Sequence, residues 1–447
     1  MKKFIALLLV SILSISVLQG CGSSGSGDVP SVPQLSDNRV INVWAFTPEI
    51  PDAINRYKEF NPSFDWEINV TVINDQDGAY EVALEQALVA GGASAPDLYT
   101  AEQAFVMKFT QGGFSSFAIP YSYLIDDLDS KIAAAQVAQY AVDVGTRNGE
   151  IVGMRFQETG ACLIYRRSIA IDTWGTDNPA EIEKITGPGW DQFLVAAAEL
   201  NAKGYSIVSG DDDIYKVLKD GAAQGWLVDG KITIDPNREY LFDLAEVMHS
   251  NNYWNGSVAW NESWNADMSD NGIRPVFAFL GPAWLINYVM ADNAGSTYGD
   301  WAVTMPPVPF TWGGTWLIAN QAIDSMEKRE AVGKLIEWVT LDTSDTGFQY
   351  FFANGTLYDE PGTKDTVASR VVMEKSDGTL DFLAGQNMFD YFIPAAAAAR
   401  ADHWTEHDRY IDEWYLDQVR MFYMGNKSKE QAIADFKQKI TDELGFE

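Results

Sequence analysis

Two spacings of apolar residues alternate near the start of the chain. Residues 40–46 are almost continuously apolar, as expected for a strand buried on both faces of a parallel sheet. Helical spacing follows and stops at the Asn61-Pro62 breaker, after which residues 66–72 alternate like a second strand. A helix over 80–90 and a third strand over 97–100 complete the pattern. Strand, helix, strand, helix, strand is the repeating unit of an open α/β sheet, so we predict an α/β fold.

The middle and the end of the chain predict further strands and helices at less regular spacing. Residues 150–168 alternate like a pair of strands around a turn at 157–160, and a polar loop at 209–213 follows a short strand. We therefore expect open mixed sheets with helices on both faces. The clearest helices are expected over 191–200, 327–339 and 408–423, the second of them opened by a capping box of Asp324 and Glu327.

Open α/β sheets bind their ligands beyond the carboxyl ends of the strands. In this chain that rule selects the loops after the first and third predicted strands. The candidate site residues near them are Trp44, Phe46, Glu49, Glu102 and Gln103.

The first residues have the pattern of a secretory signal. Lys2-Lys3 precedes an apolar run over 4–17, which is too short and wrongly flanked for a spanning helix. The order up to Cys21 resembles a bacterial lipoprotein signal, although Gln19 stands where a small residue is usual. An ordinary cleaved signal that leaves Cys21 unmodified is the alternative.

A lipoprotein signal has consequences for the mature chain. We expect residues 1–20 to be removed and Cys21 to be lipidated, which would anchor the protein to a membrane. The Gly/Ser/Pro-rich residues 21–38 would then be a flexible linker. The protein would work outside the cytoplasm, at the cell surface or on the periplasmic side.

Composition limits both the architecture and the partners. The chain is 447 residues long, too long for one hydrophobic core even without a signal, so two lobes are expected. It has 31 basic and 63 acidic side chains and a net charge of −32. Such a surface repels phosphate backbones, so we expect no nucleic-acid partner, and neutral polar ligands fit better than anionic ones. Cys162, in an apolar run, is predicted to be a small buried hydrophobe.

Motifs of catalysis and metal binding are missing or incomplete. No nucleophile elbow, phosphate loop or dinucleotide fingerprint occurs in the sequence. His403 and His407 stand four apart without the order of a zinc-peptidase motif. Residues 267–272 match the first half of a calcium loop, but Ala278 stands where a bidentate Glu is required. We therefore expect no enzyme activity, no metal and no cofactor.

Aromatic residues are abundant, with 15 Trp, 19 Tyr and 23 Phe. Trp284 follows Gly-Pro-Ala, and Trp316 follows Gly-Gly-Thr shortly after Trp312. Glycines before an indole let a ligand approach the backbone and leave the face of the ring uncovered. Such faces suit the C–H faces of sugar rings, so we predict that Trp284 and Trp316 are exposed to a ligand rather than part of the core.

Several segments together resemble the extracellular solute-binding proteins, family 1, which deliver carbohydrates to bacterial ABC importers. The resemblance spans about residues 39–339, and the tail from about 343 has only the general helical character of the family. The segments are Ile41-Asn42-Val43-Trp44, Tyr57-Lys58-Glu59-Phe60, Ala95-Pro96-Asp97-Leu98, residues 149–154, Leu163-Ile164-Tyr165, Gly281-Pro282-Ala283-Trp284, residues 301–307 and Gly313-Gly314-Thr315-Trp316-Leu317-Ile318.

The resemblance implies two α/β lobes that close over a sugar in the cleft between them. Lobe 1 would comprise 39–157 and 310–345, and lobe 2 would comprise 158–309 and 346–447. The permease subunits of an ABC importer would recognise the closed form.

The resemblance also implies roles for particular residues. Trp284 would stack on the sugar, and the segment with Gly314, Thr315 and Trp316 would line the cleft from the other lobe, next to Trp312. Polar contacts would come from the loops after the first and third strands. Asp211 and Asp213 lie where the second lobe could reach the ligand.

The expected function is therefore carbohydrate capture by a monomeric, lipid-anchored binding protein that performs no catalysis. One alternative is a secreted enzyme that cleaves polysaccharides with two of the many carboxylates. Another is the same fold binding a peptide or other small solute.

Overall fold

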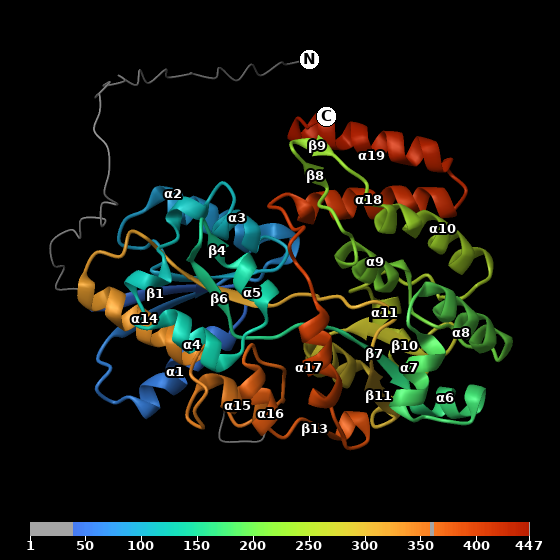
Figure 1. Ribbon diagram of the computed structural model, residues 1–447, viewed down its shortest axis with the longest axis horizontal. Coiled ribbons are helices and arrows are strands. Elements are labelled where there is room, and N and C mark those ends of the chain that lie inside the picture. Colours follow the sequence, from blue (N-terminus) through green and yellow to red (C-terminus); the bar gives the residue numbers. More distant parts are fainter. Residues whose placement is uncertain (1–38, 358–361, 447) are drawn as a thin grey trace, which may run out of the picture.

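The computed structural model describes residues 39–357 and 362–446. The expected signal peptide, the lipidation site Cys21 and the linker 21–38 lie outside the described residues. Two lobes lie side by side, and each is built around its own β-sheet (Figure 1). The expected two-lobed α/β architecture is confirmed.

Lobe 1 contains a five-stranded sheet in the order β2-β1-β3-β12-β6. Three of its strands, β1 (Val40–Ala45), β2 (Glu67–Val72) and β3 (Leu98–Glu102), are parallel. The strand β12 (Thr315–Ala319) runs antiparallel between β3 and β6 (Gly153–Arg155). The parallel strands therefore end at the edge of the sheet where β12 begins.

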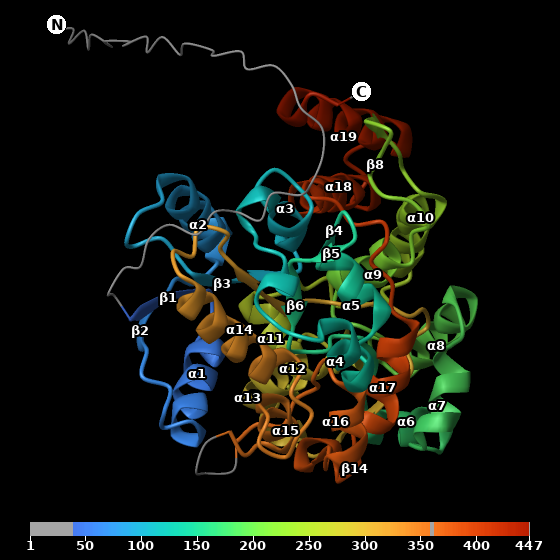
Figure 2. The ribbon, with the colours of Figure 1, turned by 60° about the vertical axis from the view of Figure 1, so that its left-hand side comes forward.

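Alternate residues of the lobe 1 strands enter two different apolar clusters. Ile41, Val43 and Leu317 pack with helices α1 and α14, whereas Tyr99 and Trp316 pack with α2, α3 and α5. Helices thus cover both faces, as the buried strands require (Figures 1 and 2). The helices and the small hairpin of lobe 1 are α1 (Glu49–Phe60), α2 (Ala79–Ala90), α3 (Val106–Thr110), α4 (Leu128–Ala135), α5 (Gln139–Val144), β4 (Thr146–Arg147), β5 (Glu150–Ile151) and α14 (Met326–Thr340).

Lobe 2 is centred on the antiparallel sheet β10-β7-β11, formed by β10 (Ala278–Gly281), β7 (Cys162–Arg166) and β11 (Trp301–Thr304). All residues of these strands are buried, and Cys162 is one of them, as predicted. The helices and the hairpin that surround it are α6 (Arg167–Trp174), α7 (Pro179–Thr186), α8 (Trp190–Ala202), α9 (Asp211–Asp220), β8 (Leu227–Val228), β9 (Lys231–Ile232), α10 (Pro236–Ser250), α11 (Glu262–Asp267), α12 (Ala283–Leu285) and α13 (Ala291–Asn293).

The C-terminal part of the chain first packs low between the lobes and then rises along lobe 2 (Figure 1). The last two helices lie together and pack on α10. The elements are α15 (Phe348–Asn354), α16 (Arg370–Lys375), β13 (Thr379–Leu380), β14 (Gln386–Asn387), α17 (Phe389–Ala398), α18 (Asp408–Tyr423) and α19 (Lys429–Leu444).

The strands predicted over 150–168 both form, and they belong to different sheets. β6 joins the lobe 1 sheet and β7 the lobe 2 sheet, so the turn predicted at 157–160 links the two lobes. Alternation of apolar and polar residues identifies a strand but does not specify which strand it pairs with. Residues 211–213 are the first turn of α9 rather than a loop, because acidic side chains are favoured at a helix N-terminus.

The helix that follows the predicted boundary of lobe 1 at residue 345 also packs on lobe 1. Phe351 of α15 stacks on Phe60 of α1 with ring centroids 5.1 Å apart, and Phe348 contacts Trp338 of α14 at 5.8 Å. These contacts place α15 with lobe 1. The helical character of the tail gave no information about which lobe it would cover.

Three segments cross from one lobe to the other; the first contains Thr159, the second Thr311 and the third Thr366. They are hydrogen-bonded to one another at the junction of the lobes. Thr159 in the first lies 2.8 Å from Thr311 in the second, measured between the hydroxyl oxygens. Thr366 in the third donates to the backbone oxygen of Glu158 at 2.6 Å. Such a buried polar network fixes the geometry of the junction.

The helix predicted at 327–339 forms as α14, with a cap one residue later than expected. The hydroxyl of Ser325 accepts from the backbone N–H of Lys328 at 3.1 Å. Within residues 39–357 and 362–446, none of the helices has the length and apolarity that a membrane crossing needs.

Candidate ligand-binding site between the lobes

Three indoles from separate parts of the chain form one cluster. Trp260 precedes α11, Trp284 lies in α12, and Trp312 lies in the second crossing segment. The ring of Trp284 is 4.6 Å from that of Trp312 and 6.1 Å from that of Trp260, centroid to centroid. We call these three residues the indole cluster.

Hydrogen bonding orients the middle ring of the cluster. The indole N–H of Trp284 donates to the backbone oxygen of Trp312 at 3.0 Å. Gly313, next in the chain, has a φ of +81°, and a Cβ there would lie 3.0 Å from Nε1 of Trp284. Glycine at position 313 therefore makes room for the indole of Trp284. Trp284 is partly buried against the core, so it is less open than its glycine-rich surroundings predicted.

Trp260 is the most open member of the indole cluster, with 60% of its surface exposed. Its φ of +70° is in the left-handed region, which is strained for a bulky residue. Trp260 was not among the residues predicted from the sequence. The polar residues around it, Asn261 and Glu262, are the kind of surroundings that singled out other tryptophans and could have identified it.

A lysine covers one face of Trp312. The ammonium of Lys216, in α9, lies 3.9 Å from the ring centroid, and its other contact is Asp213 at 3.2 Å. A cation held over an indole face is attracted by the ring electrons. Asp213 therefore contacts Lys216, and it is Lys216 that contacts the indole cluster.

A cavity of about 200 Å³ opens beside Trp312, between the lobes. Residues from both lobes line it, so its shape depends on how the lobes are placed. Lobe 1 provides Glu102 and Gln103 at the end of β3, and lobe 2 provides Lys219, Asp408 and Asp412 among others. Trp404, in the segment before α18, also lines the cavity and packs on the apolar cluster of lobe 1.

Glu102 and Gln103 lie where the topological rule places a ligand. Burial raises the pKa of Glu102, and one of its oxygens accepts from the backbone N–H of Ala104 at 2.7 Å. The side-chain oxygen of Gln103 accepts from the backbone N–H of Gly313. Its amide NH₂ group provides a donor at the cavity.

The lobe 2 wall of the cavity contains two carboxylates one helical turn apart in α18. Asp412 accepts from Tyr215 at 2.6 Å and from Trp226 at 2.8 Å. Burial would raise the pKa of Asp412, but Lys219 and these hydrogen bonds outweigh burial and hold it below its usual value. Burial and the charge of Asp412 together raise the pKa of Asp408 to about 7. Asp408 can therefore exchange a proton near neutral pH.

Glu49 begins α1 at the same edge of the lobe 1 sheet. One of its carboxylate oxygens is buried and has no hydrogen-bond partner among the described residues. Burial, together with the charge of Glu49, raises the pKa of Asp365 in the third crossing segment to about 7. Glu49 therefore retains an acceptor that a hydroxyl group could use.

The other residues predicted at the end of β1 are less open. Trp44 and Phe46 are both partly buried against the lobe 1 core. Phe46 makes edge contacts with Tyr80 at 5.8 Å and Phe105 at 6.2 Å. Of the residues predicted near the end of β1, Glu49 is therefore the one that could make a polar contact with a ligand.

Trp316 is not a ligand-facing indole, and that prediction is wrong. It is 0% exposed and lies under the guanidinium of Arg155, which is 4.7 Å from the ring centroid. Gly314 has a φ of +107°, and a Cβ there would lie 2.5 Å from Nη2 of Arg155. The glycine therefore makes room for an arginine of the protein, and Thr315 beside it is also buried, opposite Glu102 in the sheet.

Asp211 is also unavailable to a ligand. Both of its carboxylate oxygens bind the guanidinium of Arg420, at 2.8 and 3.0 Å, and one accepts from Tyr423 at 3.1 Å. The acidic cluster at 211–213 thus fastens α18 to α9 within lobe 2.

The segment that resembled half a calcium loop has a structural role. The carboxylate of Asp267 accepts hydrogen bonds from Ser209 at 2.6 Å, Ser257 at 2.7 Å and Asn255 at 2.6 Å. Within the part of the chain that the structure describes, no three His, Cys, Asp or Glu side chains are placed to hold a metal ion.

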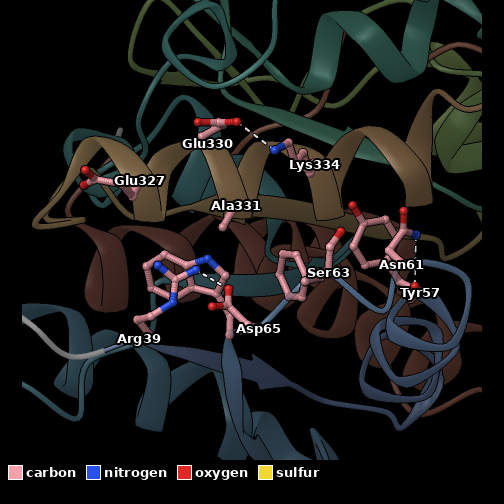
Figure 3. Close-up of a pocket in the computed structure, with 11 residues that line it drawn as sticks. Arg39, Tyr57, Asn61, Ser63, Asp65, Glu327, Glu330, Ala331 and Lys334 are labelled. Atoms are coloured by element: carbon pink, nitrogen blue, oxygen red, sulfur yellow. Dashed lines mark hydrogen bonds and ion pairs between the residues drawn. The ribbon is translucent and has the colours of Figure 1, made fainter.

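A larger groove of about 320 Å³ lies on the outside of lobe 1. Figure 3 shows it between α14, which contributes Glu330 and Lys334, and the chain before β2, which contributes Asp65. The groove lies at the amino ends of β1 and β2, opposite the edge at which Glu102 lies. Ligands bind at the carboxyl ends of such strands, so the interlobe cavity is the better candidate.

Comparisons with known proteins agree with this architecture. No family model matches the chain. A lactose-binding protein from Rhizobium radiobacter is 25% identical over 388 residues, which cover 79% of this chain and 81% of that protein.

Solved structures share the fold over nearly the whole chain. One described as extracellular solute-binding protein family 1 matches with a TM-score of 0.69 at 18% identity, covering 90% of this chain and 98% of the other. The galacto-N-biose/lacto-N-biose I-binding protein of an ABC transporter from Bifidobacterium longum, solved with lacto-N-biose, matches with a TM-score of 0.68 at 14% identity, covering 92% and 98%. The resemblance to the extracellular solute-binding proteins of family 1 is confirmed, and the fold is that of two-lobed periplasmic sugar-binding proteins.

Proposed function

We propose that this chain captures a carbohydrate between its two lobes and delivers it to the permease of an ABC importer. The observation that supports this most is the indole cluster beside a cavity lined by Glu102, Gln103 and Asp408 from opposite lobes. Indole faces suit the C–H faces of a sugar, and carboxylates and amides suit its hydroxyls. Lobe closure completes such a site, so the ligand favours the closed form.

The relatives point to a class of sugar. The lactose-binding protein and the protein solved with lacto-N-biose are both named for disaccharides that contain galactose. We propose a galactose-containing mono- or oligosaccharide as the ligand of this chain. Glu49, Glu102, Gln103, Trp260, Trp284, Trp312, Trp404 and Asp408 would contact it.

The site of action follows from the N-terminal pattern. We propose that Cys21 is lipidated and that the protein is a monomer held at the outer face of a membrane by residues 21–38. Metabolic labelling with a palmitate analogue should label the native chain, and Cys21→Ser should abolish the label and release the protein into the soluble fraction. Labelling that persists in Cys21→Ser would contradict this assignment.

Calorimetric titration with lactose, lacto-N-biose and β-1,6-galactobiose tests the ligand class. We expect one-to-one binding of at least one of them and recovery of the sugar intact. A screen in which peptides or other solutes bind and sugars do not would replace the proposed ligand within the same fold.

A second candidate is glycoside hydrolysis. Glu102 and Asp408 reach one cavity from opposite lobes. Burial and the charge of Asp412 raise the pKa of Asp408 to about 7, as a general acid requires, and Glu102 would have to act as the ionised partner. The titrated mixtures should therefore be analysed for monosaccharide products. Turnover that Glu102→Gln abolishes would favour the enzyme over the binding protein.

A further inference from the structure

The beginning of α18 contacts lobe 1, although the helix belongs to lobe 2. Nη1 of Arg409 lies 2.9 Å from Asp75 Oδ2 and 3.0 Å from Glu81 Oε2, both in lobe 1. Just before the helix, Glu406 accepts from the backbone N–H of Gly113 at 2.9 Å. Figures 1 and 2 both show this end of α18 beside α3 of lobe 1.

The rest of α18 is fixed in lobe 2. Ile411, Tyr415 and Val419 lie in the apolar cluster of that lobe. Asp412 holds the second turn through its bonds to Tyr215 and Trp226. The change of partner from lobe 1 to lobe 2 thus occurs between Arg409 and Ile411, within one helical turn. A movement of one lobe relative to the other must therefore break the Arg409 contacts.

Lobe 1 is shaped to receive these side chains. Gly112 leaves the space that Glu406 uses, because a Cβ there would lie 2.5 Å from Oε2 of Glu406. Gly78 lies against Arg409, and a Cβ on it would be 3.7 Å from the guanidinium. Glu81 is only 3% exposed at its side chain and Asp75 17%, so the ion pairs are shielded from solvent. Shielded charge pairs are worth more than ordinary surface pairs.

We propose that Arg409 and Glu406 form a latch that holds the two lobes together over the ligand cavity and thereby sets the affinity for the ligand. The proposal rests on the proposed function, since it assumes that the lobes close around a solute. Arg409 also lines the cavity, so the latch lies directly beside the candidate site. Contacts made only in the closed form shift the population toward that form and slow the release of the ligand.

The variants Arg409→Gln, Asp75→Asn and their double test the latch. Arg400→Gln is the matched control, because among the described residues Arg400 forms its ion pair with Asp402 in its own segment, and both side chains are more than half exposed. The radius of gyration of each ligand-free protein is measured by small-angle X-ray scattering, and the Kd for lactose by calorimetry.

We expect Arg409→Gln to increase the radius of gyration and to weaken lactose binding about tenfold, with faster release. Asp75→Asn should do the same to a smaller extent, since Glu81 still binds Arg409. The double variant should be no weaker than Arg409→Gln alone, because both changes remove one interaction.

Equal effects of Arg409→Gln and Arg400→Gln on both quantities would overturn the latch, and so would fully additive effects in the double variant. A wild-type protein that binds no lactose would exclude lactose as the ligand without excluding the latch, because the scattering comparison of the ligand-free proteins still tests whether Arg409 holds the lobes together. Should Arg409→Gln fail to fold, the scattering curve of Asp75→Asn tests the latch in its place.

Discussion

Trp284 stacks on Trp260 with ring planes only 6° from parallel and centroids 6.1 Å apart. Two parallel indoles at this separation leave no room for a third ring between them, so a sugar must bind to the outer face of Trp260 or at the edge of the pair. Because 60% of Trp260 is exposed, it offers the larger free surface. The relationship makes Trp260, which sequence analysis missed, the leading indole for ligand stacking.

Replacement of Trp260 by alanine should weaken sugar binding about tenfold, since a stacked ring contributes on the order of 1–1.5 kcal/mol. The unfolding free energy should change by less than about 1 kcal/mol, because the ring is mostly exposed. Trp260→Gly should be more stable than Trp260→Ala, since glycine accepts a φ of +70° without strain. Calorimetry and thermal denaturation measure both effects.

The matched control for this variant is Tyr298→Ala. Tyr298 is also an exposed aromatic residue of lobe 2, at 52%, but its ring contact is Phe382 outside the indole cluster. Its replacement should leave the Kd unchanged. An equal loss of affinity in Tyr298→Ala and Trp260→Ala would exclude a specific stacking role for Trp260.

Trp316→Ala should act on stability instead of on binding. The ring is fully buried beneath Arg155, and its N–H donates to the backbone oxygen of Ala141 at 3.3 Å. Loss of a buried Trp typically costs about 3–5 kcal/mol of unfolding free energy. Denaturant unfolding should show this loss, while the protein that remains folded binds sugar with wild-type affinity. Reduced affinity without reduced stability would return Trp316 to the ligand site.

The contrast between Trp260 and Trp316 shows what a sequence can reveal about a site. The pattern predicted the strands of lobe 1 well, because buried parallel strands leave a continuous apolar signature. It also placed Glu102 and Gln103 at the cavity, because topology fixes where strands end. The burial of Trp316 depended on Arg155 from a neighbouring strand, which no local spacing encodes.

The C-terminal contribution to the site could not be predicted for a similar reason. Asp408 lies far along the chain from β3, and the packing of α18 against lobe 2 brings it to the cavity. Trp404 precedes α18 and packs on the apolar cluster of lobe 1. The helix itself was predicted over the correct residues, 408–423. Its amphipathic pattern specifies a buried face but not the lobe that covers it.

Stability should fall as the pH rises from about 4 to 7. The pKa of Asp408 is raised to about 7 by burial and by Asp412, so the folded state holds a proton that the unfolded state has already released. Stability from such a group is present at low pH and is lost as pH rises through the folded pKa. Each proton contributes a slope of about 1.4 kcal/mol per pH unit where only the folded state is protonated.

Asp408→Asn should make this pH dependence shallower, because the amide does not titrate. Asp377→Asn is the control, since hydrogen bonds from Thr379 and Lys364 hold the pKa of Asp377 well below its usual range. Urea unfolding at several pH values measures the slopes. An unchanged slope in Asp408→Asn would show that Asp408 does not titrate in this interval.

Binding of an unaltered sugar between the lobes is tested by calorimetric titration with lactose, lacto-N-biose and β-1,6-galactobiose, followed by recovery of the ligand and small-angle scattering of the complex. We expect one-to-one binding, intact sugar and a smaller radius of gyration in the complex. Absence of binding to every sugar, or the appearance of cleaved products, would contradict this expectation.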